Sequence, residues 1–279
     1  MQNIVSNIIV RKRFLNKMFR SVHPKTLVIN IGRRFPMCID PNDISGPSFY
    51  VAYSGEAAFY HYEVSVKAAI LRYLRSDGIF LDIGANIGLI SLFISKFRPD
   101  VKIHAFEPSD VTSSCLNQNI DLLKCKNIKL HKLGVSDKSI RGAEFFIDNR
   151  SSGGNSMEAS AIADIRNKVS IDLIKLDDFV SENKIIPNVI KIDVQDHESS
   201  VLFGAKETIQ CYRPTIIVET NNKILIEKFS EISALFENYR VSSVEHEEFY
   251  ELKDWKILAE KLLKKNIATI DYVLVPKTL

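Results

Sequence analysis

Residues 79–88 read Ile-Phe-Leu-Asp-Ile-Gly-Ala-Asn-Ile-Gly, and this stretch decides the fold. A short apolar run ends in an acid and passes into a turn with two glycines, where the chain can bend sharply and a ligand can approach the backbone. Helical spacing of apolar residues begins directly afterwards, in 89–97. A strand, a glycine turn and a helix in this order predict the nucleotide-binding edge of an open α/β sheet.

Short apolar runs and helical periods alternate on both sides of this turn. We expect helices over 63–75, 88–97, 109–123, 176–183, 198–211 and 222–237, and strands over 79–83, 101–106, 128–133, 143–147, 169–174, 188–194, 214–219, 239–244 and 268–275. Such alternation is typical of βαβ units in a mostly parallel sheet. A polar stretch with paired glycines, 148–156, interrupts the alternation at the edge of the sheet where ligands bind.

The composition is that of an ordinary globular protein. The 279 residues are 46% hydrophobic and 25% charged, and the net charge of +3 is too small to indicate a nucleic-acid partner. The cysteines show neither Cys-x-x-Cys pairs nor metal-ligand spacing, so we expect no zinc site and a reducing cytoplasm. We divide the chain into an N-terminal helix and cap segment, 1–62, and one main domain, 63–279.

The first twenty residues combine apolar positions at helical spacing with interleaved arginines and lysines. The positive charge follows the apolar residues, the reverse of a signal peptide, and the run is far below the ~20 residues that span a bilayer. Two interpretations stay open. The helix packs on the domain, or it contacts an anionic membrane surface peripherally.

The spacing of the glycines discriminates between nucleotides. A dinucleotide site requires Gly-x-Gly-x-x-Gly, whereas Asp82 here precedes the turn Gly84-Ala85-Asn86-Ile87-Gly88. A carboxylate at this place attracts a cationic ligand and repels a pyrophosphate. We therefore predict S-adenosylmethionine, with Asp82 facing its ammonium end and the turn meeting its carboxylate and sugar. A helix N-cap is the alternative role for Asp82.

Glu107 follows the second predicted strand, in Phe106-Glu107-Pro108. An acid about 20 residues beyond the glycine turn, at the tip of the second strand, accepts hydrogen bonds from both ribose hydroxyls. Pro108 fixes the chain behind it and starts the next helix. We predict Glu107 as the ribose ligand, and a solvated loop carboxylate is the alternative.

Several stretches in order resemble the FkbM-type S-adenosylmethionine-dependent methyltransferases. They are 80–88, 105–108, 134–137, 155–156, 174–179 and 189–194, with a looser match at 271–276. The resemblance implies a class I methyltransferase fold, a Rossmann-like α/β sheet of about seven mostly parallel strands with the last antiparallel. It also implies methylation of a hydroxyl on a sugar, glycan or secondary metabolite, with S-adenosyl-L-methionine as the methyl donor.

Further cofactor contacts follow from the resemblance. The loop after the third strand reaches the adenine in such folds, so Ser136 and Asp137 are expected there, with a turn cap as the alternative for Asp137. Glu63 matches an acid that often precedes the first core helix in the family. We expect it at the amino-acid end of the cofactor, and a helix-start carboxylate is its alternative.

The end of the fourth predicted strand carries the catalytic question. Methyl transfer from a sulfonium requires alignment and removal of a proton from the acceptor hydroxyl. The family usually has a glycine after Asp-Val-Glu or Asp-Val-Gln, but this chain reads Asp193-Val-Gln-Asp-His-Glu198, so Asp196 must tolerate an unusual backbone angle. We predict that Asp193, with His197 or Glu198, orients and deprotonates the acceptor. In the alternative, Glu198 caps a helix and His197 only lines the pocket.

Other readings stay open at this stage. Asp193, Asp196 and Glu219 are candidate ligands for Mg²⁺, which some sugar methyltransferases use. A non-catalytic binding module is the alternative function, because fold does not fix function. Methylation of a nucleic acid or a protein is a further alternative, although the Asn/Asp-Pro-Pro-aromatic motif and a Pro-Cys nucleophile are missing from the sequence.

Overall fold

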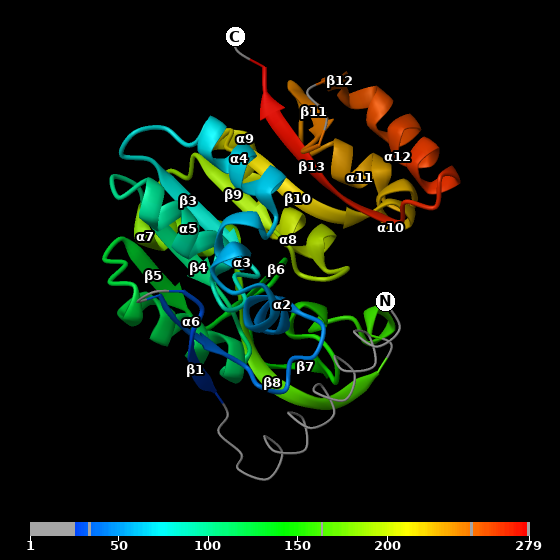
Figure 1. Ribbon diagram of the computed structural model, residues 1–279. Helices are drawn as coiled ribbons and strands as arrows, with labels where there is room; N and C mark the ends of the chain where they lie inside the picture. The colour runs from blue at the N-terminus through cyan, green and yellow to red at the C-terminus, as the bar shows by residue number, and fades with distance from the viewer. Residues whose placement is uncertain (1–25, 33–34, 163, 246–247, 278–279) are drawn as a thin grey trace.

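The computed structural model describes residues 26–32, 35–162, 164–245 and 248–277 (Figure 1). The predicted N-terminal basic helix lies outside these residues. The main element is an eight-stranded sheet in the order β12-β11-β13-β10-β9-β3-β4-β5. Its strands are β3 Ile79–Ile83, β4 Lys102–Phe106, β5 Ile128–His131, β9 Val189–Ile192, β10 Thr215–Asn221, β11 Tyr239–Ser243, β12 Tyr250–Glu251 and β13 Thr269–Pro276.

The pairing of these strands confirms the predicted mostly parallel sheet. Strands β5, β4, β3, β9 and β10 run parallel to one another. The last strand, β13, lies antiparallel between β10 and β11. A mixed sheet of this order, with the reversed strand β13 inserted between β10 and β11 and the short β12 reversed at the edge, is the class I methyltransferase arrangement that the sequence predicts.

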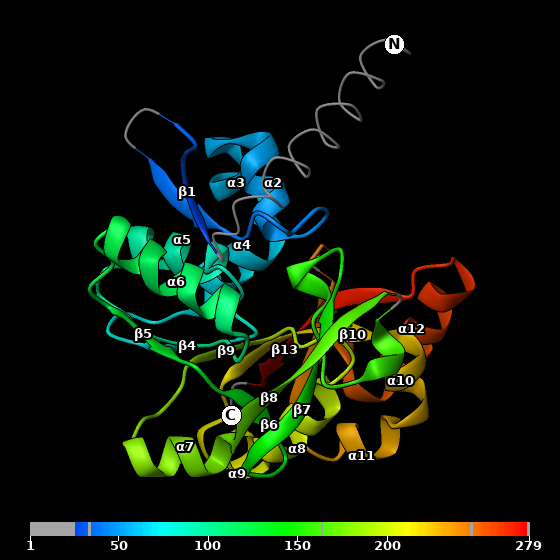
Figure 2. The same cartoon turned by 90° about the horizontal axis from the view of Figure 1, so that it is seen from below.

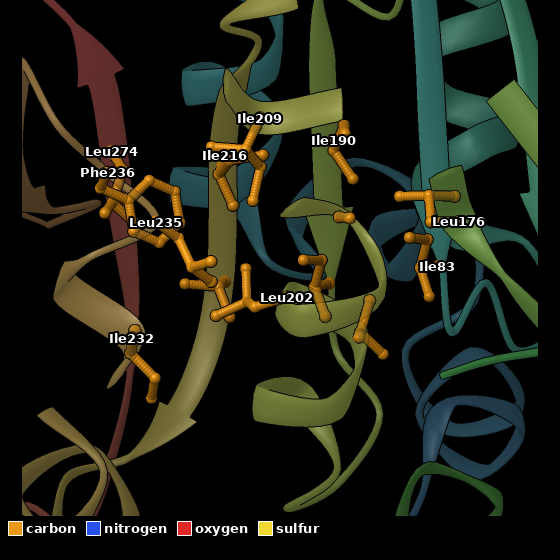
Figure 3. Packing of buried hydrophobic residues seen from close by; sticks show 14 of the residues in the cluster. Ile83, Leu176, Ile190, Leu202, Ile209, Ile216, Ile232, Leu235, Phe236 and Leu274 are labelled. Carbon is orange, nitrogen blue, oxygen red and sulfur yellow. The ribbon is translucent and has the colours of Figure 1, made fainter. Parts of the chain in front are cut away.

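Helices cover both faces of the sheet (Figures 1 and 2). One face carries α4 Val64–Tyr73, α5 Leu89–Phe97 and α6 Asp110–Leu122, and the other carries α7 Leu176–Asn183, α8 Glu198–Gly204, α9 Lys206–Tyr212, α10 Asn222–Glu227, α11 Phe229–Ser233 and α12 Trp255–Lys264. Side chains alternate between the faces along each strand. Leu81, Ile83 and Ile190 therefore join the α7–α8 layer shown in Figure 3, while Phe80 and Val189 pack under α4 and α5.

Two predicted helices differ in detail, and one observed helix was not predicted. The helix expected over 198–211 is two helices, α8 and α9, that meet at Ala205. A Cβ on Gly204 would lie 2.0 Å from the carbonyl oxygen of Ser136, so the end of α8 packs directly on the backbone of the strand β6, Gly134–Ser136. The helix expected over 222–237 is also divided, into α10 and α11. Helix α12 was not predicted.

The segment around the polar stretch forms a second sheet. Strands β6 Gly134–Ser136, β7 Ile140–Asp148 and β8 Ile165–Lys175 pair in the order β6-β8-β7. The strand predicted at 169–174 does not extend the parallel sheet but forms a long antiparallel hairpin with β7. One face of this hairpin buries Phe145, Ile171 and Leu173 in a small cluster of their own, which explains why these strands pair with each other.

The described part of the cap covers one side of the main domain. It consists of β1 Leu27–Asn30, β2 Pro36–Ile39, α2 Pro47–Ser54 and α3 Glu56–His61. Its apolar side chains share a core with α5 and α6. The Asn119 amide joins the parts, because it accepts from Cys38 N at 2.6 Å and donates to Ile87 O at 3.0 Å. Within the described ranges, no helix is long and apolar enough to cross a bilayer.

Candidate active site

A cavity lies at the carboxyl ends of β3, β4, β9 and β10. It is lined by the turn after β3, the loops after β5 and β9, the hairpin of the second sheet, and the cap. This is the edge where ligands bind in open α/β sheets. The predicted residues that line it are Gly84, Ala85, Asn86, Glu107, Glu63, Asp193 and His197.

The two glycines of the turn have different tasks. Gly84 has φ +83°, and a Cβ there would lie 1.8 Å from the carbonyl oxygen of Asp193. The turn can therefore pass close to the end of β9 only with glycine at this position. Gly88 has φ +94° and packs against Leu116 of α6, where a Cβ would lie 2.3 Å from a methyl carbon. Gly88 thus supports the turn from outside the cavity.

Glu107 is buried and holds the turn from the neighbouring strand. Its Oε2 accepts from Asn86 N at 2.9 Å, and its Oε1 accepts from Ser109 N at 3.0 Å and Thr112 Oγ1 at 2.7 Å. Burial raises the pKa of Glu107, against the effect of these donors. Because Oε2 has a single donor, it can accept a further hydrogen bond from a ligand in the cavity.

Asp82 lies beneath the turn and is fully buried. Its Oδ2 accepts from Ser91 Oγ at 2.6 Å, in the first turn of α5, whereas its Oδ1 has no hydrogen-bond partner among the described residues. Burial raises the pKa of this carboxyl. An unpartnered buried oxygen is rare, but Asp82 is not among the residues that line the cavity, because it lies beneath the turn.

Lys191 supplies a cation that the sequence analysis missed. It is 3% exposed and pairs in register with Asp82 across the β3–β9 ladder. Its Nζ lies 3.1 Å from Asp193 Oδ2. Burial alone would lower the pKa of Lys191, but the surrounding carboxylates, first of all Asp193, outweigh it and raise the pKa. The alternation of strand side chains could have revealed this residue, because positions 191 and 193 share a face.

The environment of Asp193 keeps this carboxylate ionised. Burial opposes ionisation, but Lys191 and hydrogen bonds from its neighbours hold the pKa of Asp193 below its usual range. Glu219 behaves in the opposite way, because the nearby charge of Asp193, together with burial, raises its pKa to about 10. When two adjacent carboxyls share one proton, the pKa of one falls and the pKa of the other rises. In this pair the proton resides on Glu219, and Asp193 is the ionised partner.

Gln195 connects these two carboxyls. Its Nε2 donates to Asp193 Oδ1 at 2.7 Å and to Glu219 Oε2 at 2.9 Å. Gln195 has φ +53° and Asp196 has φ +70°, so the unusual backbone angle predicted for Asp196 is confirmed. Two consecutive non-glycine residues in the left-handed region are costly and are found mainly at functional sites. Ser156 of the polar stretch donates to the backbone oxygen of Gln195 and holds this loop.

His197 lines the cavity but is bonded on both ring nitrogens. Nε2 lies 2.9 Å from Ser136 Oγ, and Nδ1 lies 3.2 Å from Glu158 Oε1. Glu198 is 4% exposed, and its Oε1 accepts from Val194 N at 3.0 Å at the start of α8. The structure therefore brings His197 to the cavity wall and leaves Glu198 behind it, where burial raises the pKa of Glu198 to about 8.

The other end of the cavity is apolar. Leu133, Gly134 and Val135 line it, together with side chains of the hairpin such as Ile171 and Leu173. Ser136 and Asp137, which the sequence analysis assigned to this end, are not among the lining residues. Ser136 Oγ instead bonds Asp137 Oδ1 at 3.1 Å and the His197 ring. Leu133, Gly134 and Val135 line the cavity. Ser136, the last residue of β6, lies instead at the contact between β6 and α8.

Glu63 stands on the cap side of the cavity, next to Tyr62. It occupies the N-cap position of α4 with φ +45°, but its side chain makes no capping hydrogen bond. Burial raises the pKa of Glu63, and the charge of Lys191 opposes this rise. Glu63 therefore belongs to the carboxylate cluster around Lys191.

The described residues form no group of three or more His, Cys, Asp or Glu side chains that could hold a metal ion. The Mg²⁺ ligands considered from the sequence do not converge as a set. Asp193 and Glu219 line the cavity, but Asp196 is not among its lining residues. The Lys191 ammonium lies among the carboxylates instead.

The fold and the site together define a class I methyltransferase, with a glycine turn after the first strand of the parallel sheet, an acid after the second strand and a carboxylate at the end of the fourth strand. The chain belongs to the FkbM methyltransferase family, because the model of the Methyltransferase FkbM domain matches residues 82–243. It is accordingly an enzyme of the S-adenosylmethionine-dependent class.

Curated relatives agree with this assignment. The chain is 27% identical over 184 residues to the 31-O-demethyl-FK506 methyltransferase FkbM of Streptomyces tacrolimicus, covering 55% of this chain and 70% of that protein. It is 26% identical over 182 residues to Methyltransferase 1 of Beauveria bassiana, covering 59% and 73%. It is 29% identical over 163 residues to the hexuronic acid methyltransferase AglP of Haloferax volcanii, covering 56% and 61%.

Proposed function

We propose that the chain transfers a methyl group from S-adenosylmethionine to a hydroxyl oxygen of a sugar, a glycan or a secondary metabolite. The observation that carries this proposal is Asp193, a carboxylate that Lys191 keeps ionised at the cavity wall beside the glycine turn. Such a group is suited to take the proton of a hydroxyl as that oxygen is methylated.

The residues of the turn fit the methyl donor. Gly84, Ala85 and Asn86 line the cavity where the amino-acid end of the donor would lie, and the Asp82 carboxyl lies beneath them. Glu107 Oε2 has capacity for a ribose hydroxyl, and the apolar wall at Leu133–Val135 suits a nucleobase. When bound, the cofactor supplies an electrophilic methyl group on a sulfonium.

The chain's own residues would then complete the reaction at Asp193. With the donor bound, S-adenosylmethionine would supply the methyl group and leave as S-adenosylhomocysteine, and the acceptor oxygen would gain this methyl group in exchange for its proton. The hydroxyl proton passes to the Asp193 carboxylate, which Lys191 and Gln195 hold in place. The remaining contribution of the enzyme is alignment of the two reactants in the cavity.

The substrates named for two relatives support a hydroxyl acceptor. One acts on 31-O-demethyl-FK506 and one on a hexuronic acid. Both kinds of molecule offer hydroxyl oxygens. Small molecules and glycans of this kind are the acceptor class that we propose, in preference to a nucleic acid, because a net charge of +3 is too small to indicate a nucleic-acid partner.

The test is a methyl-transfer assay read by mass spectrometry. The full chain is incubated with S-adenosylmethionine carrying a CD₃ group and with a panel of methyl glycopyranosides and polyhydroxylated macrolides. The expected result is transfer of one CD₃ group to an acceptor oxygen with release of S-adenosylhomocysteine. An enzyme that binds the cofactor by calorimetry but labels no acceptor would point to a non-catalytic module instead.

A further inference from the structure

The acceptor end of the cavity contains a side chain whose orientation is fixed by chemistry. Gln195 Nε2 faces two carboxyl groups, Asp193 and Glu219. The opposite orientation of the amide would place its oxygen against Asp193, which carries a negative charge. The donor end of Gln195 is therefore fully used within the protein, and its carbonyl oxygen, Oε1, is the end that remains to face a ligand.

The position of this oxygen is constrained as well. Nε2 is 2.7 Å from Asp193 Oδ1, and the oxygen and nitrogen of one amide are about 2.2 Å apart, so Oε1 lies within roughly 5 Å of that carboxylate oxygen. Adjacent hydroxyl oxygens on a ring are roughly 2.8 Å apart, about the length of one hydrogen bond. Two such hydroxyls can reach Asp193 and Gln195 at the same time.

The loop is built to hold Gln195 in this position. Left-handed backbone at residues 195 and 196 turns the chain, and Ser156 of the polar stretch binds the Gln195 backbone oxygen. Glu219 completes the support, because its neutral carboxyl accepts from Gln195 without repelling Asp193. A strained segment held from two sides is expected where geometry serves a ligand.

We propose that Gln195 makes the enzyme specific for acceptors with two adjacent hydroxyl groups. Asp193 receives the proton of the hydroxyl that is methylated, and Gln195 Oε1 accepts a hydrogen bond from its neighbour. An acceptor without the second hydroxyl leaves the amide oxygen without this hydrogen bond, which lowers the kcat/KM of that acceptor at least about ten-fold. This inference rests on the proposed O-methyl transfer and adds the acceptor pattern to it.

The experiment uses methyl glycopyranosides and their monodeoxy analogues. Screening first identifies a glycoside that is methylated and the oxygen that receives the methyl group. The kcat/KM of this probe is then compared with those of the two analogues that lack one adjacent hydroxyl. We expect the wild-type enzyme to disfavour one analogue by at least about ten-fold.

Substitution of Gln195 tests whether this side chain causes the discrimination. In Gln195→Met the ratio of kcat/KM for the probe to kcat/KM for that analogue should fall to about two or less. The ratio within one variant cancels any general effect on Asp193 or on folding. Gln210→Met, an exposed position on α9, is the matched control and should keep the wild-type ratio.

Each other result overturns the inference. Equal kcat/KM values of the wild-type enzyme for the probe and both deoxy analogues show that the enzyme recognises no neighbouring hydroxyl. If Gln195→Met still disfavours the deoxy analogue by at least about ten-fold, another residue recognises the neighbouring hydroxyl. If no glycoside or other alcohol is methylated although S-adenosylhomocysteine binds by calorimetry, the proposed function fails and the acceptor pattern fails with it.

Discussion

The two halves of the cavity are built in different ways. The cofactor half is made from backbone, because the turn at Gly84–Asn86 approaches the end of β9 with no room for a side chain, and one acid, Glu107, fixes it. The acceptor half is made from polar side chains at the ends of β9 and β10, with Asp193 bound by Lys191 and Gln195, and Gln195 bound to Glu219. The first half depends on shape, and the second depends on charge. Substitutions should therefore affect the two halves through different measurable quantities.

The largest effect is expected in the acceptor half. Asp193→Asn removes the proton acceptor while keeping the size of the side chain, so the rate of methyl transfer should fall by about 10²- to 10⁴-fold. Cofactor affinity should change by no more than a few-fold. Single-turnover transfer and calorimetry with S-adenosylhomocysteine measure the two quantities, and Asp178→Asn on exposed α7 surface is the control. A rate within ten-fold of wild type would remove Asp193 from the role of base.

The reverse pattern is expected in the cofactor half. Gly84→Ala adds a Cβ that would lie 1.8 Å from the Asp193 carbonyl oxygen, so cofactor affinity should fall by at least about ten-fold and stability by roughly 1–3 kcal/mol. Gly142→Ala is an informative control, since φ is +75° there but the nearest atom is the Ser170 hydroxyl oxygen at 3.3 Å. It should lose stability alone. Equal losses of cofactor affinity in Gly84→Ala and Gly142→Ala would show that the close approach of Gly84 to the Asp193 carbonyl oxygen does not determine cofactor binding.

The pH dependence of stability tests the charge in the acceptor half. Burial raises the pKa of Glu198 to about 8 in the folded state. A raised folded pKa means that this carboxyl stabilises the fold at pH below its ordinary pKa and that the contribution is lost as pH rises to 8. Glu198→Gln stays neutral, so it should gain roughly 2–4 kcal/mol relative to wild type between pH 4.5 and 9.

Urea unfolding at several pH values measures this gain. Glu182→Gln, at an exposed position of α7, should show none. If wild type and Glu198→Gln have parallel stability profiles across this range, the carboxyl is ionised in the fold at neutral pH.

The smallest effect is expected at His197. Both ring nitrogens already have partners, so His197→Ala should lower kcat/KM by less than about ten-fold. The loss should come mainly from the Glu158 side chain, which no longer has the His197 ring as its partner. His61→Ala on the exposed end of α3 serves as the control. A loss of 100-fold or more, together with a changed pH–rate profile, would instead establish His197 as a base.

Sequence patterns predicted most of the fold because they are local. The strand at 79–83 and the helix at 176–183 were predicted with the bounds observed, since each has a clear period. The long β7–β8 hairpin was not predicted as a separate sheet, because its pairing depends on contacts between residues such as Ala143 and Ile171 that are far apart in sequence. Helix α12 has the apolar spacing of a helix and was overlooked.

The candidate site divides in the same way. The backbone positions of the turn and Glu107 follow from a short motif and lie at the cavity. Lys191 could have been found from its spacing to Asp193. The hydrogen bonds that occupy His197, and those that place Glu198 behind the wall, depend on Ser136, Glu158 and the backbone of Val194. No pattern around residue 197 contains that information.

The position of Lys191 links the two halves energetically. One buried ammonium is shared by a carboxylate under the cofactor turn, Asp82, and the carboxylate that faces the acceptor, Asp193. A ligand that changes the charge near one of them changes how strongly the ammonium favours the other. By thermodynamic reciprocity, the methyl donor must then influence acceptor affinity by the same factor as the acceptor influences binding of the donor.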